Sequence, residues 1–200
     1  MTRNEPRGEI SPEPSPADVP LRDLPTIDLS DQQFTEAERI AHERSRSYED
    51  IDDRRLYGEQ TNLDAHLTGV VGELAVAELY DGTIDREIYE RGDDGHDLVL
   101  NGTTIDVKTT RTSSLTRPDL IVPSEPTPAA DYYFLVHWVE PRTVRIIGYA
   151  SRDRVLDREP RRFPGTTWNY IVPPAELFIP SEHSPPQRVE QQLFFEGELA

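Results

Sequence analysis

The chain has 200 residues, no cysteine, and 38 acidic against 21 basic side chains, which gives a formal net charge of −17. This length suits one domain with a proper core. The composition excludes a disulfide framework and a thiolate metal site, and no apolar run approaches the roughly 20 residues that a membrane-spanning helix needs. The first residues also lack the apolar stretch of a secretory signal, so we expect a soluble, cytoplasmic protein that does not contact a membrane.

The basic residues are almost all arginine, and the only lysine of the chain is Lys108. Acid excess, scarce lysine and a single methionine together resemble proteins of halophilic archaea or of their viruses; a plain acidic protein with a codon bias is the alternative. Such acidity opposes nucleic-acid binding. However, molar salt shortens the Debye length to roughly 3 Å. Residues 111–162 also carry nine arginines against seven acids, so one side of the molecule can still face phosphates.

The expected elements begin after a disordered, proline-rich tail at residues 1–27, which holds six prolines. A polar surface helix is expected from Asp31 to Ser47. A second helix starts near Asn62 or Asp64, either of which is a suitable N-cap, and ends at about Tyr80 before Asp81 and Gly82. Within it, Gly69 and Gly72 lower helix propensity, which makes sense if another element packs closely there.

Strand patterns follow the second helix. They cover residues 84–89, 97–100, 103–109, 119–122, 132–139, 144–149 and 171–172. Asn101 and Gly102 are the strongest short hairpin signal, and prolines at 118, 123, 126 and 128 exclude a long helix after the third of these strands. Ser151 can cap a short helix to about Asp157. The sequence predicts one α/β domain over residues 28–180, a central mixed sheet flanked by helices, and a C-terminal tail over 181–200.

The hairpin places two acids and the lysine on one face of the sheet. If Asn101 and Gly102 are the central residues of a type I′ turn, Asp97 lies opposite Asp106, and Lys108 projects on the same side. The other face is then apolar, with Leu98, Leu100, Ile105 and Val107. Two carboxylates facing each other at about 5 Å repel unless a cation lies between them. Mg²⁺ suits this position, because it binds one or two carboxylates together with water and phosphate.

These residues resemble the signature of the PD-(D/E)XK nuclease superfamily, which has the restriction-endonuclease-like fold. That signature is an acid on one strand and an acid-x-lysine on the next, here Gly95-His96-Asp97 and Asp106-Val107-Lys108. The family often adds a glutamate from the preceding helix, and Glu73 fits in order and setting. The family also places a helix after the lysine strand, where this chain has prolines. The resemblance covers about residues 63–150.

The resemblance implies a Mg²⁺- or Mn²⁺-dependent deoxyribonuclease that hydrolyses DNA phosphodiester bonds, as an endonuclease or an exonuclease. Asp97 and Asp106 would hold the metal with the Val107 carbonyl, Glu73 would ligate or orient a metal-bound water, and Lys108 would serve the nucleophile. Thr110 and Arg111 follow on the same strand as weaker candidates for substrate contact. Double-strand cutters of this family often dimerise, so a homodimer is compatible with the resemblance.

Two other functions compete with the nuclease. One is a non-catalytic module that keeps the nuclease fold to bind nucleic acid or protein. The other is an acidic interaction protein, such as a DNA mimic, which the net charge would suit. Neither of these two functions explains why the single lysine occupies the motif position, which would then be a coincidence. Where arginine replaces lysine almost everywhere, a retained lysine indicates a role that arginine cannot fill, because arginine does not deprotonate.

The remaining chemistry-bearing residues have ordinary interpretations. His96 alternates away from Asp97, and His137 is expected to be a core histidine. The acidic pairs 52–53 and 93–94 are expected to be solvated loops. Five arginines (Arg152, Arg154, Arg158, Arg161 and Arg162) either bind phosphates or form surface ion pairs. Trp168 and Tyr170 are expected in the core rather than stacked on bases. The tail at 191–195 resembles a sliding-clamp-binding peptide with altered spacing, and self-packing or disorder is the favoured interpretation.

Overall fold

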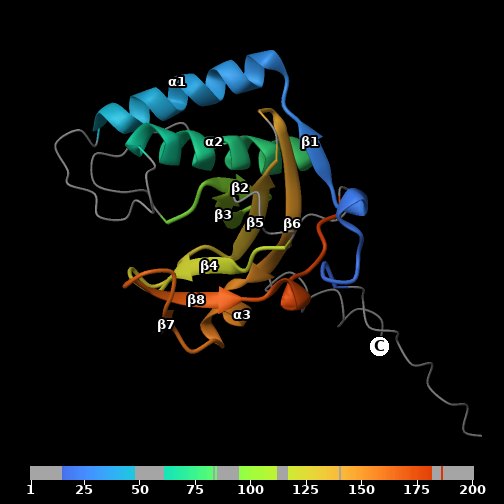
Figure 1. Ribbon diagram of the computed structural model, residues 1–200, viewed down its shortest axis with the longest axis vertical. Coiled ribbons are helices and arrows are strands. Elements are labelled where there is room, and N and C mark those ends of the chain that lie inside the picture. The colour runs from blue at the N-terminus through green and yellow to red at the C-terminus, as the bar shows by residue number, and fades with distance from the viewer. Residues whose placement is uncertain are drawn as a thin grey trace, which may run out of the picture.

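The computed structural model describes residues 15–47, 61–82, 84, 95–111, 117–139, 141–181 and 186, and its centre is a five-stranded mixed sheet (Figure 1). The strands lie in the order β1-β6-β5-β3-β2. Their bounds are β1 Thr26–Asp28, β2 Leu98–Leu100, β3 Thr103–Thr110, β5 Tyr132–Trp138 and β6 Thr143–Ser151. β3 and β5 are parallel, and the other neighbours are antiparallel. β2 is therefore an edge strand, and β3 lies beside it.

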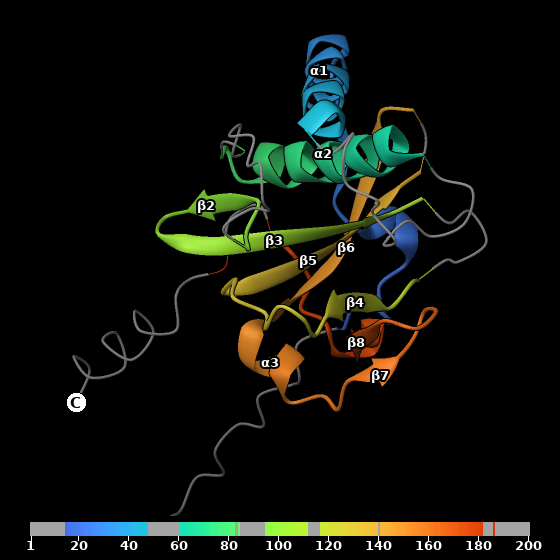
Figure 2. The same ribbon diagram turned by 90° about the vertical axis from the view of Figure 1, so that its left-hand side faces the viewer.

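Two helices cover one face of this sheet. α2 (Asn62–Leu79) packs on β3, β5, β6 and β1, and α1 (Asp31–Ser47) packs on α2. α2 is apolar around much of its circumference because it lies between α1 and the sheet, and nine of its residues are buried. Figure 2, seen from the β2–β3 edge, shows α1 crossing above α2 and α2 above the sheet.

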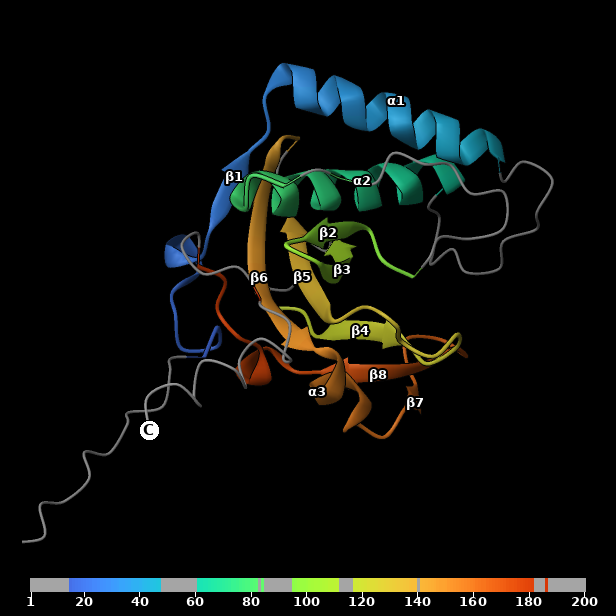
Figure 3. The ribbon, with the colours of Figure 1, turned by 180° about the vertical axis from the view of Figure 1, so that it is seen from behind.

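A second, three-stranded sheet covers part of the other face, in the order β4-β8-β7. Its strands are β4 Leu120–Pro123, β7 Arg161–Arg162 and β8 Trp168–Val172, and the short helix α3 (Arg152–Leu156) packs beside β8 and β6. Figure 3, from behind, shows the long strand β6 running from the helical layer to α3. The chain also forms 3-10 turns at Leu21–Asp23 and Pro174–Glu176.

Each face of the main sheet has its own core. The core under α2 includes Val70, Val76, Phe134 and Ile146. The core under the small sheet includes Leu120, Tyr133, Leu135 and Ile147. All seven residues of β5 are buried, which explains its continuous apolar sequence: unlike an edge strand, β5 is covered on both faces.

The expected α/β class and most expected elements are confirmed, with differences at their ends. The first helix has the expected bounds. The N-cap of α2 is Thr61, not Asn62 or Asp64; Thr61 Oγ1 accepts from the Asp64 amide, and the Asp64 carboxylate accepts from the Thr61 amide in a capping box. Ser151 caps α3 as expected.

Other differences concern the region before β2 and the expected N-terminal tail. Of the strand expected at 84–89, the structure describes only Ile84, which forms an isolated bridge to Leu98. Within the expected tail, Leu24 is buried and Thr26 begins β1. No helix in the described ranges is long and apolar enough to cross a bilayer. The acidic pairs 52–53 and 93–94 and the segment 191–195 lie outside the described residues.

Candidate active site

The three regular pairs of the β2–β3 hairpin have the register that the sequence predicts, whereas the fourth predicted pair, Asp97 with Asp106, is not among them. Leu98 pairs with Ile105, Val99 with Thr104, and Leu100 with Thr103. Asn101 and Gly102 have φ angles of 51° and 79°, as the two central residues of a type I′ turn require. The predicted apolar face is confirmed, since Leu98, Leu100, Ile105 and Val107 are all buried.

Asp97 lies just before β2, because the regular strand begins at Leu98, one residue later than predicted. Its backbone N–H donates to the Ile105 carbonyl at 2.7 Å. Its carboxylate Oδ2 accepts from the backbone N–H of Val107 at 2.6 Å, so a side-chain oxygen takes the place of a strand carbonyl. The N–H and C=O of one antiparallel-strand residue face the same neighbour. The Val107 carbonyl therefore faces the side on which the Asp97 carboxylate lies.

The Asp97 carboxyl is in an unfavourable environment for a negative charge. Burial, followed by the charges of Glu73 and Asp106, holds its pKa well above the ordinary value for an aspartate. Lys108 and the hydrogen bond from Val107 act in the opposite direction and are smaller effects. The charges of Glu73, Asp106 and Lys108 thus all affect the pKa of Asp97.

Asp106 and Lys108 form an ion pair on the face opposite α2. Lys108 Nζ lies 2.5 Å from Asp106 Oδ1 and donates to Oδ2 at 2.8 Å. The contact follows from the strand itself, because side chains two residues apart share a face. Asp106 Oδ1 is buried and, among the described residues, accepts no hydrogen bond of acceptable geometry. That oxygen keeps capacity for a further cation.

Glu73 of α2 is 3% exposed and is held by Arg44 of α1. The guanidinium donates two hydrogen bonds, from Nη1 to Oε1 at 2.7 Å and from Nη2 to Oε2 at 3.0 Å. A bidentate pair of this kind fixes the carboxylate in direction as well as in charge. Sequence reasoning missed Arg44, because nothing distinguishes it from the other arginines of the chain before α1 is packed against α2.

The backbones of α2 and β3 approach closely beside these residues. A Cβ atom added at Gly72 would lie 1.9 Å from Thr109 Oγ1 and 3.1 Å from Thr109 Cβ, whereas one added at Gly69 would meet only Glu73 Oε1, at 3.6 Å. The expectation of close packing is therefore confirmed for Gly72 and is wrong for Gly69. Since Gly72 precedes Glu73 and Thr109 follows Lys108, this approach sets the distance between the helix and strand parts of the site.

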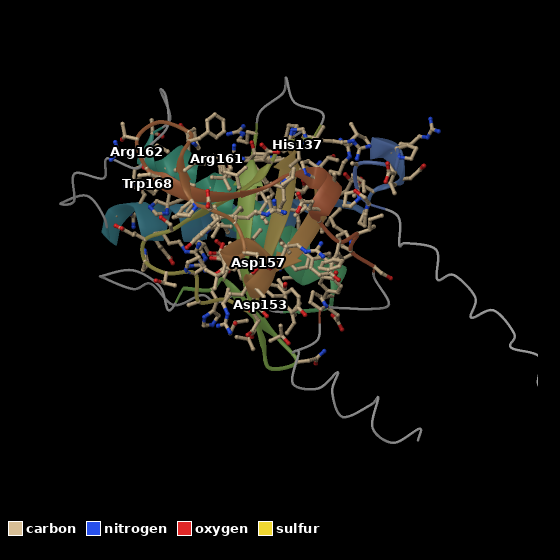
Figure 4. The ribbon with its side chains drawn as sticks, turned by 90° about the horizontal axis from the view of Figure 1, so that it is seen from below. His137, Asp153, Asp157, Arg161, Arg162 and Trp168 are labelled. Atoms are coloured by element: carbon tan, nitrogen blue, oxygen red, sulfur yellow. The ribbon has the colours of Figure 1, made fainter. Side chains whose placement is uncertain are left out.

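The two weaker substrate candidates lie at the end of β3. Thr110 is half-buried and is paired with His137 of β5. Arg111 is exposed, and its guanidinium carbon lies 3.9 Å from the centroid of the Trp138 ring, so it packs against an aromatic side chain. His137 is 8% exposed, as expected for a core histidine. Figure 4 shows it well apart from Asp153 and Asp157 of α3.

The residues that could hold a metal are two acids and one carbonyl. Among the described residues, no three acidic or histidine side chains lie close enough to form a ready-made metal site. Asp97, Asp106 and the Val107 carbonyl nevertheless offer hard oxygen atoms, the kind that Mg²⁺ binds. With every group ionised, Glu73, Asp97 and Asp106 against Arg44 and Lys108 give a net charge of −1, which a divalent cation would turn to +1.

The second sheet differs from expectation at Trp168. This side chain is 46% exposed, so the expected core position is wrong for Trp168, whereas Tyr170 packs partly against the core.

Of the five arginines expected on phosphates or in ion pairs, Arg158 pairs with Glu176, and Arg154 donates to the Glu176 carbonyl. Arg161 and Arg162 are exposed on β7. The expected edge strand at 119–122 is confirmed as β4, so a strand stands where the family has a helix.

No family model, no curated protein and no solved structure matches the chain.

Proposed function

We propose that the protein is a metal-dependent nuclease that hydrolyses DNA phosphodiester bonds at Asp97, Asp106 and Lys108. The observation that carries the proposal is the buried carboxyl of Asp97, which accepts from the Val107 N–H and whose pKa is raised by burial and by the charges of Glu73 and Asp106. Burying a carboxyl within the electrostatic influence of two other acids is costly, so folding alone does not favour this arrangement. A cation-binding function gives a reason for it.

The chain's own residues have distinct parts in this proposal. Asp97 and Asp106, with the Val107 carbonyl, would hold Mg²⁺ or Mn²⁺, and the buried Asp106 Oδ1 has acceptor capacity left for it. When bound, the cation supplies Lewis-acid stabilisation of the phosphoryl group. Lys108 is 33% exposed at its side chain and can orient or activate the attacking water, or hold the negative charge of the transition state. Glu73, fixed by Arg44, would orient a water molecule.

The test is a cleavage assay on supercoiled, linear and branched DNA, with Mg²⁺, Mn²⁺ or EDTA, at low and high KCl. We expect metal-dependent cutting that falls by at least about 100-fold in Lys108→Ala and in Asp97→Asn. Lys108→Arg keeps the positive charge but should not restore activity, because a guanidinium cannot release a proton.

Glu38→Gln is the matched control, because Glu38 is an exposed carboxylate on α1; it should cut like the wild type. Cutting that survives both Asp97→Asn and Lys108→Ala would refute the assignment of the site.

One observation favours the rival function, a binding module without catalysis. Two of the three carboxylates already have a cation, Arg44 on Glu73 and Lys108 on Asp106. A binding module would keep these ion pairs for stability and would not bind a divalent cation. Calorimetric titration with Mn²⁺ separates the two functions: heat that is lost in Asp97→Asn supports the nuclease, and no heat with the wild type supports the module.

A further inference from the structure

The β7–β8 hairpin exposes two large aromatic side chains beside two arginines. Trp168 is 46% exposed and Phe163 is 52% exposed, the latter being the most exposed large hydrophobic residue of the described chain. Arg161 and Arg162 are exposed on β7. Figure 4 shows Arg161, Arg162 and Trp168 gathered at one corner, apart from the acids Asp153 and Asp157 of α3. We call these four residues (Arg161, Arg162, Phe163 and Trp168) the hairpin surface.

Among the described residues, the arginines of the hairpin surface have no acidic partner. The Arg162 guanidinium carbon lies 5.2 Å from the centroid of the Trp168 ring, and neither Arg161 nor Arg162 forms an ion pair within the described part of the chain. By contrast, Arg158, three residues before Arg161, pairs with Glu176. Residues 158–172 hold three arginines and one acid, a local balance of +2 in a chain of −17. The positive charge is therefore presented to solvent.

The segment that carries Phe163 and Trp168 is anchored by the buried side-chain amide of Asn169. Asn169 is 1% exposed, and its Nδ2 donates to the Phe163 carbonyl at 2.8 Å and to the Thr167 carbonyl at 3.0 Å. The Trp168 carbonyl accepts from the backbone N–H and the hydroxyl of Ser124, at 3.0 and 3.1 Å. A loop fixed at both ends presents its rings without a large ordering cost on binding. Exposed rings on a fixed loop indicate a binding surface.

We propose that the hairpin surface binds single-stranded DNA, with a base stacked on Trp168 and a backbone phosphate on Arg162, its cross-strand partner, and with Phe163 and Arg161 contacting neighbouring nucleotides. Aromatic rings beside a positive charge are the combination that binds single strands without base specificity. A duplex hides the faces of its bases, so the rings favour unpaired nucleotides. The inference rests on the proposed function only in taking DNA as the ligand, and it makes the substrate one that contains a single-stranded segment.

The test is fluorescence quenching by oligo(dT) in EDTA, where no metal-dependent step takes part. The chain has two tryptophans, and Trp138 is buried at 5% exposed, so Trp138→Phe leaves Trp168 as the single reporter. We expect saturable quenching by oligo(dT) and little by a blunt duplex. Because quenching in EDTA reports binding alone, this result is separate from any failure of the nuclease assay.

Variants measured by the anisotropy of labelled oligo(dT) assign the binding to the hairpin surface. Trp168→Ala should weaken binding by about fivefold or more, and Trp168→Phe should recover most of it. Leu156→Ala, at an exposed apolar residue of α3, is the matched control and should bind like the wild type. Trp168 is exposed, so its replacement should leave the circular dichroism spectrum unchanged.

The salt dependence tests the arginines separately. Two phosphates neutralised on a single strand give a slope of log K against log salt of about −1.4, and the double change of Arg161 and Arg162 to Ala should remove most of this slope. Arg22→Ala, in the 3-10 turn on the other side of the molecule in Figure 1, should keep it. Absence of oligo(dT) binding by the wild type, or equal binding by Trp168→Ala, would overturn the inference and leave the surface for a protein partner.

Discussion

The contact between Gly72 and Thr109 allows a test of how the fold sets the geometry of the site. Replacing Gly72 by Ala places a methyl group 1.9 Å from Thr109 Oγ1. Rotation of the threonine side chain cannot relieve the contact fully, because Thr109 Cβ itself lies 3.1 Å from the new atom. The α2 and β3 backbones must therefore move apart.

The expected magnitude follows from two opposing effects. Alanine in place of glycine favours the helix by about 1 kcal/mol, and overpacking a core costs about 1–3 kcal/mol. We expect Gly72→Ala to lower the free energy of unfolding by about 0–2 kcal/mol, or the melting temperature by up to roughly 8 °C. Gly69→Ala is the matched control in the same helix. Its new Cβ meets only an ordinary contact at 3.6 Å, so it should be neutral or stabilising.

Thermal and urea unfolding followed by circular dichroism measure both variants. Thr109→Ala in the Gly72→Ala background removes the opposing Oγ1 and Cγ2 atoms, and a favourable coupling of about 1 kcal/mol is expected in the double-mutant cycle. If Gly72→Ala is as stable as Gly69→Ala, the reasoning is refuted. Nuclease activity should also fall in Gly72→Ala, because a shift of about 1 Å between Glu73 and Lys108 can cost 100-fold in rate.

Three further predictions follow. Because the Asp97 pKa is raised on folding, the folded protein holds a proton that the unfolded chain releases near pH 4; stability from this group falls as pH rises toward the folded pKa, and urea unfolding from pH 4 to 8 should show a smaller fall in Asp97→Asn. Arg44→Ala removes the two hydrogen bonds that the guanidinium donates to the buried Glu73 carboxylate and should cost about 3 kcal/mol in urea unfolding, whereas Arg39→Ala, at an exposed ion pair on the same helix, should change little. Asn169→Ala removes two buried hydrogen bonds and should cost about 1–3 kcal/mol, with Trp168 emission shifted to the red. An unchanged unfolding midpoint in Arg44→Ala or Asn169→Ala, or an equal pH slope in Asp97→Asn, would contradict the corresponding prediction.

The hairpin was predictable from sequence because its signals are local. Asn101-Gly102 defines the turn, and the alternation on either side defines the register, so the positions of Asp106 and Lys108 followed from short-range geometry. The start of β2 was not predictable. There the Asp97 carboxylate accepts the hydrogen bond from the Val107 N–H, and the alternation of apolar residues does not show that a side-chain oxygen replaces a strand carbonyl.

The contacts between elements were the other gap. Arg44 lies 29 residues before Glu73, and their pairing depends on how α1 crosses α2, which is a tertiary property. Trp168 was expected in the core because aromatic residues near apolar strands usually are. In the structure it lies at the start of β8, beside the short edge strand β7, and is 46% exposed. Local patterns thus predicted the strand part of the site and the resemblance supplied Glu73, whereas Arg44 and the exposure of Trp168 were missed.

The distribution of charge connects the two proposals. A chain of −17 repels DNA over its surface as a whole, so any attraction must be local. At the proposed active site the attraction would come from a divalent cation, whose effect on a phosphate in direct contact is little screened by salt. At the hairpin surface the two phosphate contacts would weaken with salt, whereas the stacking of bases on the rings would not depend on counterion release. The metal contact and the stacking therefore persist at high ionic strength, whereas a broad arginine patch would lose most of its affinity there. An acidic protein that works in concentrated salt would therefore place its DNA contacts at a metal and at exposed rings.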